Sequence, residues 1–135
     1  MLSYTDVVHL SKSFELRCSK HIAVLVQGAD ILDVFTNRYA CHAEELALWH
    51  YRQRFRHCTR NVKLFVVRVS DGNKFSRPCR DCCKLMTKFP HIRVFYSGTD
   101  GEWREELNYD SSHVSQRRLQ LKICRQCVPL KPGRD

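Results

Sequence analysis

The pattern of apolar and polar positions along the chain alternates between the spacing of helices and that of strands. Residues 64–67 form a continuous apolar run, which predicts a strand buried on both faces of a sheet. A first helix has one apolar face, made by Val7, Val8, Leu10 and Phe14. The predicted helices span residues 4–19, 42–55, 79–89 and 111–123, and the predicted strands span residues 21–28, 31–37, 61–70, 92–97 and 102–107.

The order of these elements predicts the fold class. Strands that flank helices indicate an α/β domain with a central mixed five-stranded sheet flanked by helices. The turn-forming residues 98–101 favour a hairpin, in which the last two strands run antiparallel. A helix at residues 102–110 is the alternative, because Glu102, Glu105 and Glu106 are good helix formers.

Length and composition predict a single globular domain. At 135 residues, we expect one domain over residues 1–128 and a flexible tail over residues 129–135. No apolar run reaches the roughly 20 residues of a membrane span, and the N-terminus does not resemble a signal peptide. We therefore expect a protein without a membrane partner, in the cytoplasm or, at this small size, the nucleus.

The chain is strongly basic, with a formal net charge of +9. This balance is consistent with anionic partners such as nucleotide phosphates or nucleic acid, or simply with a soluble surface. From residue 113 to 134 there are six basic residues and no acidic one, although aromatic residues that could stack on bases are sparse there. Solvated faces and contacts to another subunit remain alternatives. The candidate phosphate or nucleic-acid contacts are Arg52, Arg56, Arg117, Arg118 and Lys122.

Two short motifs carry the candidate chemistry. His42 and Glu44 would point about 200° apart inside a helix, so they can serve one site only at the very tip of a helix. Cys79 and Cys82 share one face of a helix that we expect to begin after Pro78, with both cysteines in its first turn. The exposed N–H groups and the dipole there favour thiolates.

One imidazole and two thiolates are the ligands of a zinc ion that keeps a fourth position open for water. An open position is typical of catalytic zinc, which makes hydroxide available near neutral pH. Glu44, which directly follows the histidine motif, is then the expected general base and proton shuttle. The alternative is two unrelated motifs, with His42 at the surface and the cysteines a structural pair.

These residues resemble the signature H-x-E…P-C-x-x-C of the zinc-dependent cytidine and deoxycytidylate deaminase superfamily. It stands here as His42 to Glu44 and Pro78 to Cys82, and the resemblance covers roughly residues 20–98. It implies a three-layer deaminase-like fold and hydrolytic conversion of cytosine to uracil. It also implies substrate contacts at Ala43, Pro78 and Asn37, although Asn37 suits the end of a strand equally well.

The resemblance leaves the substrate open. An antiparallel last pair of strands is typical of deaminases of free nucleosides, and it also occurs in some that act on nucleic acid. We expect a cytosine-containing nucleoside or nucleotide as substrate, and single-stranded DNA or RNA is the alternative. A catalytically silent, zinc-stabilised nucleic-acid-binding module is the alternative from another class. Members of this fold that act on free nucleosides commonly assemble, so a homo-oligomer is compatible with this interpretation.

The chain has eight cysteines, and those outside the motif have less certain roles. Cys83 is expected to be a core thiol, and Cys41 is expected not to be a ligand. Cys124 and Cys127 form a second C-x-x-C pair, which we interpret as reduced thiols. A second, structural zinc is the alternative, for which Cys18, Cys58 and His113 could supply further ligands.

Overall fold

The computed structural model of this protein describes residues 2–11, 21–37, 41–69 and 75–111. Nearly all of the predicted closing helix at residues 111–123 lies outside these ranges, and so does the predicted tail. The same holds for part of the first predicted helix, including Phe14, and for the following candidate residues: Cys18, His113, Arg117, Arg118, Lys122, Cys124 and Cys127.

A mixed sheet forms the centre of the described structure, as the sequence predicts. The strand order is β2-β1-β3-β4-β5. The pair β3 and β4 is parallel, whereas each of the other neighbouring pairs is antiparallel. The strands are β1 (His21–Gln27), β2 (Asp30–Thr36), β3 (Val62–Arg68), β4 (Ile92–Ser97) and β5 (Trp103–Glu105).

The apolar run in β3 explains why this strand lies in the middle of the sheet. Leu64 and Val66 belong to the core cluster on one face, and Phe65 and Val67 belong to the cluster on the other face. All four side chains are at most 1% exposed. The prediction of a strand buried on both faces is therefore confirmed.

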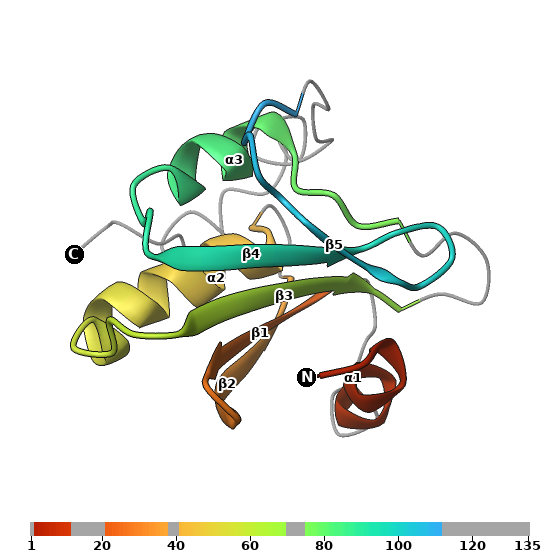
Figure 1. The fold of residues 1–135 in the computed structure, drawn as a ribbon, viewed down its shortest axis with the longest axis horizontal. Coiled ribbons are helices and arrows are strands. Elements are labelled where there is room, and N and C mark those ends of the chain that lie inside the picture. Colours follow the sequence, from red (N-terminus) through yellow and green to blue (C-terminus); the bar gives the residue numbers. More distant parts are fainter. Residues whose placement is uncertain (1, 12–20, 38–40, 70–74, 112–135) are drawn as a thin grey trace.

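Helices cover both faces of the sheet, as Figure 1 shows. The helix α1 (Tyr4–Ser11) lies against one face, where Val7 is fully buried. The helices α2 (Ala43–His50) and α3 (Arg80–Met86) pack against the other face. Within the described residues, no helix has both the length and the apolar character needed to cross a membrane.

The helix predicted at residues 42–55 is regular only in its first part. It continues after His50 as a π-helical turn, η1 (Tyr51–Phe55). The hydroxyl of Tyr51 donates a hydrogen bond to the backbone carbonyl of Cys58 at 2.7 Å and also contacts Nε2 of His91. These contacts hold a residue that is 2% exposed at the point where the helix widens.

The hairpin predicted near the end of the sheet is present. Gly101 adopts a φ of 82°, a left-handed conformation that glycine reaches without strain, in the turn before β5. Tyr96 pairs with Arg104 in the antiparallel ladder of β4 and β5. The alternative of a helix at residues 102–110 is therefore wrong.

The topology brings the starts of α2 and α3 to one edge of the sheet. In the ladders, Ile22 lies opposite Thr36 at the end of β2, and His21 lies opposite Arg68 at the end of β3. The chain enters α2 after β2 and enters α3 after β3. Side chains at the beginnings of both helices can therefore meet, which is the usual place for a site in an open α/β sheet.

Candidate metal centre

The two cysteines and the histidine of the sequence motifs stand at the tips of α2 and α3. His42 is the residue before α2 and has extended backbone angles (φ −72°, ψ 152°). Its backbone N–H donates to Oε1 of Glu45 at 3.1 Å, which fixes the entry into the helix. Cys79 stands in the same position before α3, also extended (φ −73°, ψ 171°).

The start of α3 differs from the prediction by one position. The sequence predicts Cys79 in the first turn together with Cys82, whereas in the structure it precedes the helix, which begins at Arg80. Pro78 is buried and lies one residue further out. Because the chain is extended at Cys79, its side chain can still turn towards Cys82 in the first turn, and the two sulfur atoms share one site.

The ligand atoms of His42, Cys79 and Cys82 lie within 4.8 Å of one another. Nδ1 of His42 lies 3.3 Å from Sγ of Cys82 and 3.7 Å from Sγ of Cys79. A tetrahedral zinc ion with usual bond lengths separates a nitrogen from a sulfur ligand by about 3.6 Å. These three residues are therefore close enough to hold a metal ion, and their donor atoms fit zinc.

The thiols of Cys79 and Cys82 are electrostatically coupled. The hydrogen bond from Cys82 lowers the pKa of Cys79 to about 4, against the effect of burial, and His42 contributes in the same direction. The same hydrogen bond raises the pKa of Cys82, as do burial and the negative charge of Glu44. One thiolate is thus already favoured by the protein, and a bound cation would stabilise the second.

Glu44 is buried beside this group, with 5% of its surface exposed. Its charge acts on Cys82, although its carboxylate is not among the three mutually close ligands. Ala43 is fully buried at the first position of α2. The structure thus places Ala43, Glu44 and Pro78 directly beside the residues that could hold the ion.

Asn37 lies at the end of β2, at the same edge of the sheet. The side-chain oxygen of Asn37 accepts a hydrogen bond from the backbone N–H of His21 at 3.2 Å. The backbone N–H of Asn37 donates to the backbone carbonyl of His21. Asn37 therefore extends the pairing of β1 and β2. The pKa of His21 is lowered to about 4, mainly by burial and also by the charges of His42 and Arg68.

The segment that leads into Cys79 is held by residues that no motif in the sequence indicates. The hydroxyl of Ser76 lies 2.7 Å from that of Ser97 and donates to the carbonyl of Val66 at 2.8 Å. Both serines are buried. Arg77 forms an ion pair with Glu106. Ser76 and Arg77 directly precede Pro78, and this position was the only signal in the sequence that could have drawn attention to them.

The remaining cysteines of the described part are buried and do not belong to the ligand set. Cys41 and Cys83 are each 1% exposed and do not belong to the group of three ligands. Burial raises the pKa of the Cys83 thiol to about 11, with a further contribution from the charge of Glu106. Cys83 is therefore neutral near pH 7, as expected of a core thiol.

The arginines in and directly after η1 have several different environments. The guanidinium of Arg52 lies over the ring of Phe89 at 5.6 Å, and Arg54 forms an ion pair with Asp33. Arg52 and Arg56 are exposed. A cavity of about 330 Å³ between α2 and α3 is lined by Glu45, Leu48, Trp49, Arg52, Leu85, Lys88 and Phe89, and it does not include the three candidate ligands.

Neither a scan of protein-family models nor searches of curated proteins and of solved structures found a match to this chain. What the protein does must therefore be inferred from the chemistry and geometry of its own side chains.

Proposed function

We propose that this protein is a zinc-dependent hydrolytic deaminase, similar to the cytidine and deoxycytidylate deaminase superfamily, that converts the cytosine of a nucleoside or nucleotide to uracil. The observation that carries the proposal is the position of Glu44. This carboxylate is 5% exposed and lies at the helix tip where His42, Cys79 and Cys82 converge. A site that only holds an ion has no use for such a group, and burying a carboxylate is costly.

The three ligands would hold the zinc ion and leave a fourth position for water. Neutral His42 would bind through Nδ1, which faces both sulfur atoms, and its other ring nitrogen would carry the proton. Cys79 and Cys82 would bind as thiolates. When bound in such a site, zinc lowers the pKa of a water molecule to about 7 and so makes a nucleophile available.

Glu44 would move the protons of the reaction. Its carboxylate would accept a proton from the attacking water, pass one to the ring nitrogen of the base, and assist the departure of ammonia. Cytosine and water thereby give uracil and ammonia. The backbone of Ala43 and the ring of Pro78, which flank the ligands, would border the base, and the amide of Asn37 would contact the base or the sugar.

The arrangement of the sheet supports a small substrate. The strands β4 and β5 are antiparallel, as is typical of deaminases that act on free nucleosides. The three layers visible in Figure 1 also agree with a deaminase-like fold. The protein would work in the cytoplasm or the nucleus on a cytosine-containing nucleoside or nucleotide.

The net charge favours a second candidate function, the deamination of single-stranded DNA or RNA. The formal charge is +9, and Arg52 and Arg56 are exposed. A polymer whose phosphates contact several cations binds more weakly as salt increases. A free nucleotide, with few phosphate contacts, depends on salt much less.

The test offers the purified protein cytidine, deoxycytidine, their monophosphates and cytosine-containing single strands, and detects uracil by mass. We expect conversion of at least one free nucleoside or nucleotide, and none by Glu44→Gln. Conversion of single strands alone would establish the second candidate function. No conversion of any substrate by a zinc-loaded protein would favour a binding module without catalysis.

A further inference from the structure

The segment before Cys79 is tied to the residue that follows the edge strand β5 by an ion pair whose carboxylate is buried. Nε of Arg77 donates to Oε1 of Glu106 at 2.8 Å, and its Nη2 donates to Oε2 at 3.2 Å. Only 3% of the Glu106 side chain is exposed, whereas 30% of the Arg77 side chain is exposed. Such a bidentate pair fixes both the distance and the orientation of its partners.

Glu106 is held in turn by the strands and by the chain that follows β5. Its backbone N–H donates to the carbonyl of Val94 at 2.8 Å, and Oε2 accepts the backbone N–H of Tyr109 at 3.2 Å. The thiol of Cys83 donates to Oε1 at 3.8 Å. In Figure 1 the chain after β5 runs from the sheet to the first turn of α3. Glu106 thus joins β4 through its backbone, and α3 and this crossing segment through its carboxylate.

Arg77 and Ser76 hold the same short segment at two consecutive residues. The hydroxyl of Ser76 connects this segment to the ends of β3 and β4. The backbone N–H of Ser76 donates to the carbonyl of Ser97 at 2.9 Å. Nη2 of Arg77 also donates to Asp110 at 2.8 Å. Pro78, whose φ angle is fixed by its ring, then leads directly to Cys79. Little freedom remains in the backbone that carries this sulfur.

We propose that Arg77 and Glu106 are positioning residues that hold Cys79 in place for metal binding and thereby set the affinity of the site for zinc. The inference rests on the proposed function, because it assumes that the site binds zinc. A ligand that must be ordered when the metal binds weakens binding by the entropy of that ordering. Supporting interactions around metal ligands typically change metal affinity by 10- to 100-fold.

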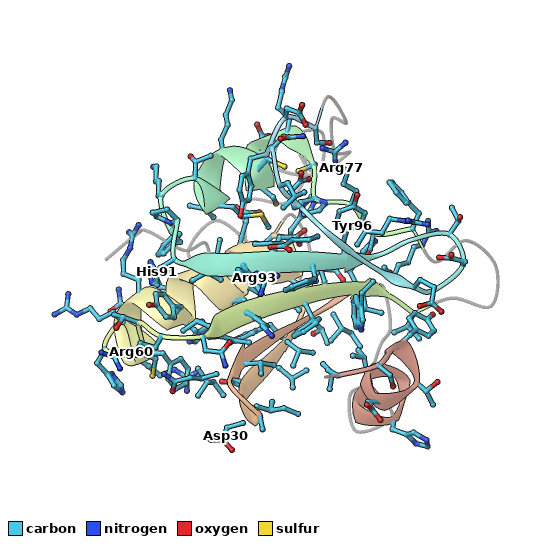
Figure 2. All side chains as sticks on the ribbon, in the orientation of Figure 1. Asp30, Arg60, Arg77, His91, Arg93 and Tyr96 are labelled. Carbon is cyan, nitrogen blue, oxygen red and sulfur yellow. The ribbon has the colours of Figure 1, made fainter. Side chains whose placement is uncertain are left out.

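The protein contains a matched control pair. Arg93 and Glu105 also form two hydrogen bonds, at 2.9 and 2.8 Å, and Glu105 is the neighbour of Glu106. This second pair is more exposed, at 57% and 25% of the side chains, and no ligand lies next to either residue. Figure 2 shows Arg77 near the start of α3 and Arg93 on β4. The two pairs therefore share their chemistry and differ in their burial and in their connection to Cys79.

The experiment measures zinc affinity by competition with a chelator for the double variants Arg77→Met/Glu106→Gln and Arg93→Met/Glu105→Gln. The first leaves no unpaired charge in the interior, and Arg77→Lys supplies a milder variant that keeps the charge without the bidentate geometry. We expect the first double variant to bind zinc 10- to 100-fold more weakly and Arg77→Lys several-fold more weakly. The control should remain within twofold of the wild type.

Affinity is measured well below the melting temperature, so that a loss of stability alone does not change it. The absorption bands of bound Co²⁺ report separately on the ligand geometry, which should change in the Arg77 variants and not in the control. Zinc affinity within twofold of the wild type in the Arg77 variants would overturn the inference, as would equal weakening in the control. A wild-type protein that binds no zinc would overturn the proposed function and this inference together.

Discussion

Nδ1 of His42 lies 3.3 Å from Sγ of Cys82, although 40 positions of the chain separate the two residues. Each residue comes from a different helix, and each stands within the first turn or directly before it. The sheet brings these two helix starts to one edge because α2 follows β2 and α3 follows β3. The close approach of imidazole and thiol is thus a consequence of the topology.

This geometry leads to a prediction for the metal content. We expect one zinc per chain in the wild type and a loss of zinc in Cys82→Ala, because two remaining ligands hold the ion much more weakly. Cys58→Ala is the matched control, since Cys58 is also a buried thiol, at 7% exposure, and does not belong to the ligand group. Metal analysis of the three proteins measures the stoichiometry.

Full zinc in Cys82→Ala would remove Cys82 from the site. A wild-type stoichiometry near two would indicate the second site, at Cys124 and Cys127, which the sequence leaves open.

The buried His21 predicts how stability depends on pH. Its pKa is lowered to about 4 in the folded protein, mainly by burial, and is about 6.5 in an unfolded chain. Between these values the unfolded state binds more protons than the folded state. The contribution of His21 to the free energy of unfolding is therefore fully present above pH 6.5 and is lost as the pH decreases towards 4. The full loss from this residue is about 3 kcal/mol.

The measurement compares denaturant unfolding of the wild type and of His21→Gln at pH 7.5 and pH 4.5. Any acid release of zinc should affect both proteins similarly, so the difference between them reports on His21. We expect the variant to lose less stability on acidification. Equal losses in both proteins would show that His21 is not held neutral by the fold.

Part of this site could be predicted from the sequence because the signal is local. The apolar run at residues 64–67 identifies β3, and the C-x-x-C spacing identifies Cys79 and Cys82 as neighbours, whereas the meeting of His42 with them is implied only by the resemblance to a known signature. Both patterns are contained in short stretches of chain. Physical requirements such as burial on both faces of a strand, or two thiols one helical turn apart, are visible in such stretches.

The parts that could not be predicted depend on tertiary contacts. The change from α-helix to π-helix at Tyr51 coincides with contacts of its hydroxyl to Cys58 and to His91, which is 40 positions away. Arg77 and Glu106 are 29 positions apart, and the sequence contains no pattern that pairs them. From the sequence, Glu106 is expected to be a helix former or a surface residue, and only the folded structure shows that it is buried.

Asn37 gives a prediction that separates a structural from a substrate-binding role. Asn37→Asp keeps an oxygen that can accept the His21 N–H, whereas Asn37→Ala removes it. We expect Asn37→Ala to lower stability by about 1 kcal/mol and Asn37→Asp to change it little. If the amide N–H₂ also contacts the substrate, Asn37→Asp should lower kcat/KM about tenfold, which corresponds to one lost hydrogen bond.

Thermal melting and steady-state kinetics of both variants measure the two roles. An unchanged kcat/KM in Asn37→Asp would restrict Asn37 to its role at the end of β2. Lower stability in both variants would show that the side chain contributes to the fold through its N–H₂ group as well.

The last prediction concerns Glu44, on which the proposed chemistry depends. Glu44→Gln should keep the fold and the zinc, because an amide fills the same buried space and no ligand is removed. General acid–base catalysis usually contributes about 10²- to 10⁴-fold. Because this one carboxylate would carry out each proton transfer, the rate of deamination should decrease by about that factor or more. Glu44→Ala should lose activity to a similar extent.

The neighbouring carboxylate provides the control for this experiment. Glu45 accepts the backbone N–H of His42, and in Glu45→Gln the amide oxygen can accept the same hydrogen bond. This variant should therefore retain activity within a few-fold of the wild type, with the same zinc content. Equal melting temperatures with turnover lost only in the Glu44 variants would assign Glu44 to the mechanism. If Glu44→Gln instead remained within a few-fold of wild-type turnover, this helix tip would not be the active site, and a zinc-stabilised binding module would become the better explanation of the buried ligands.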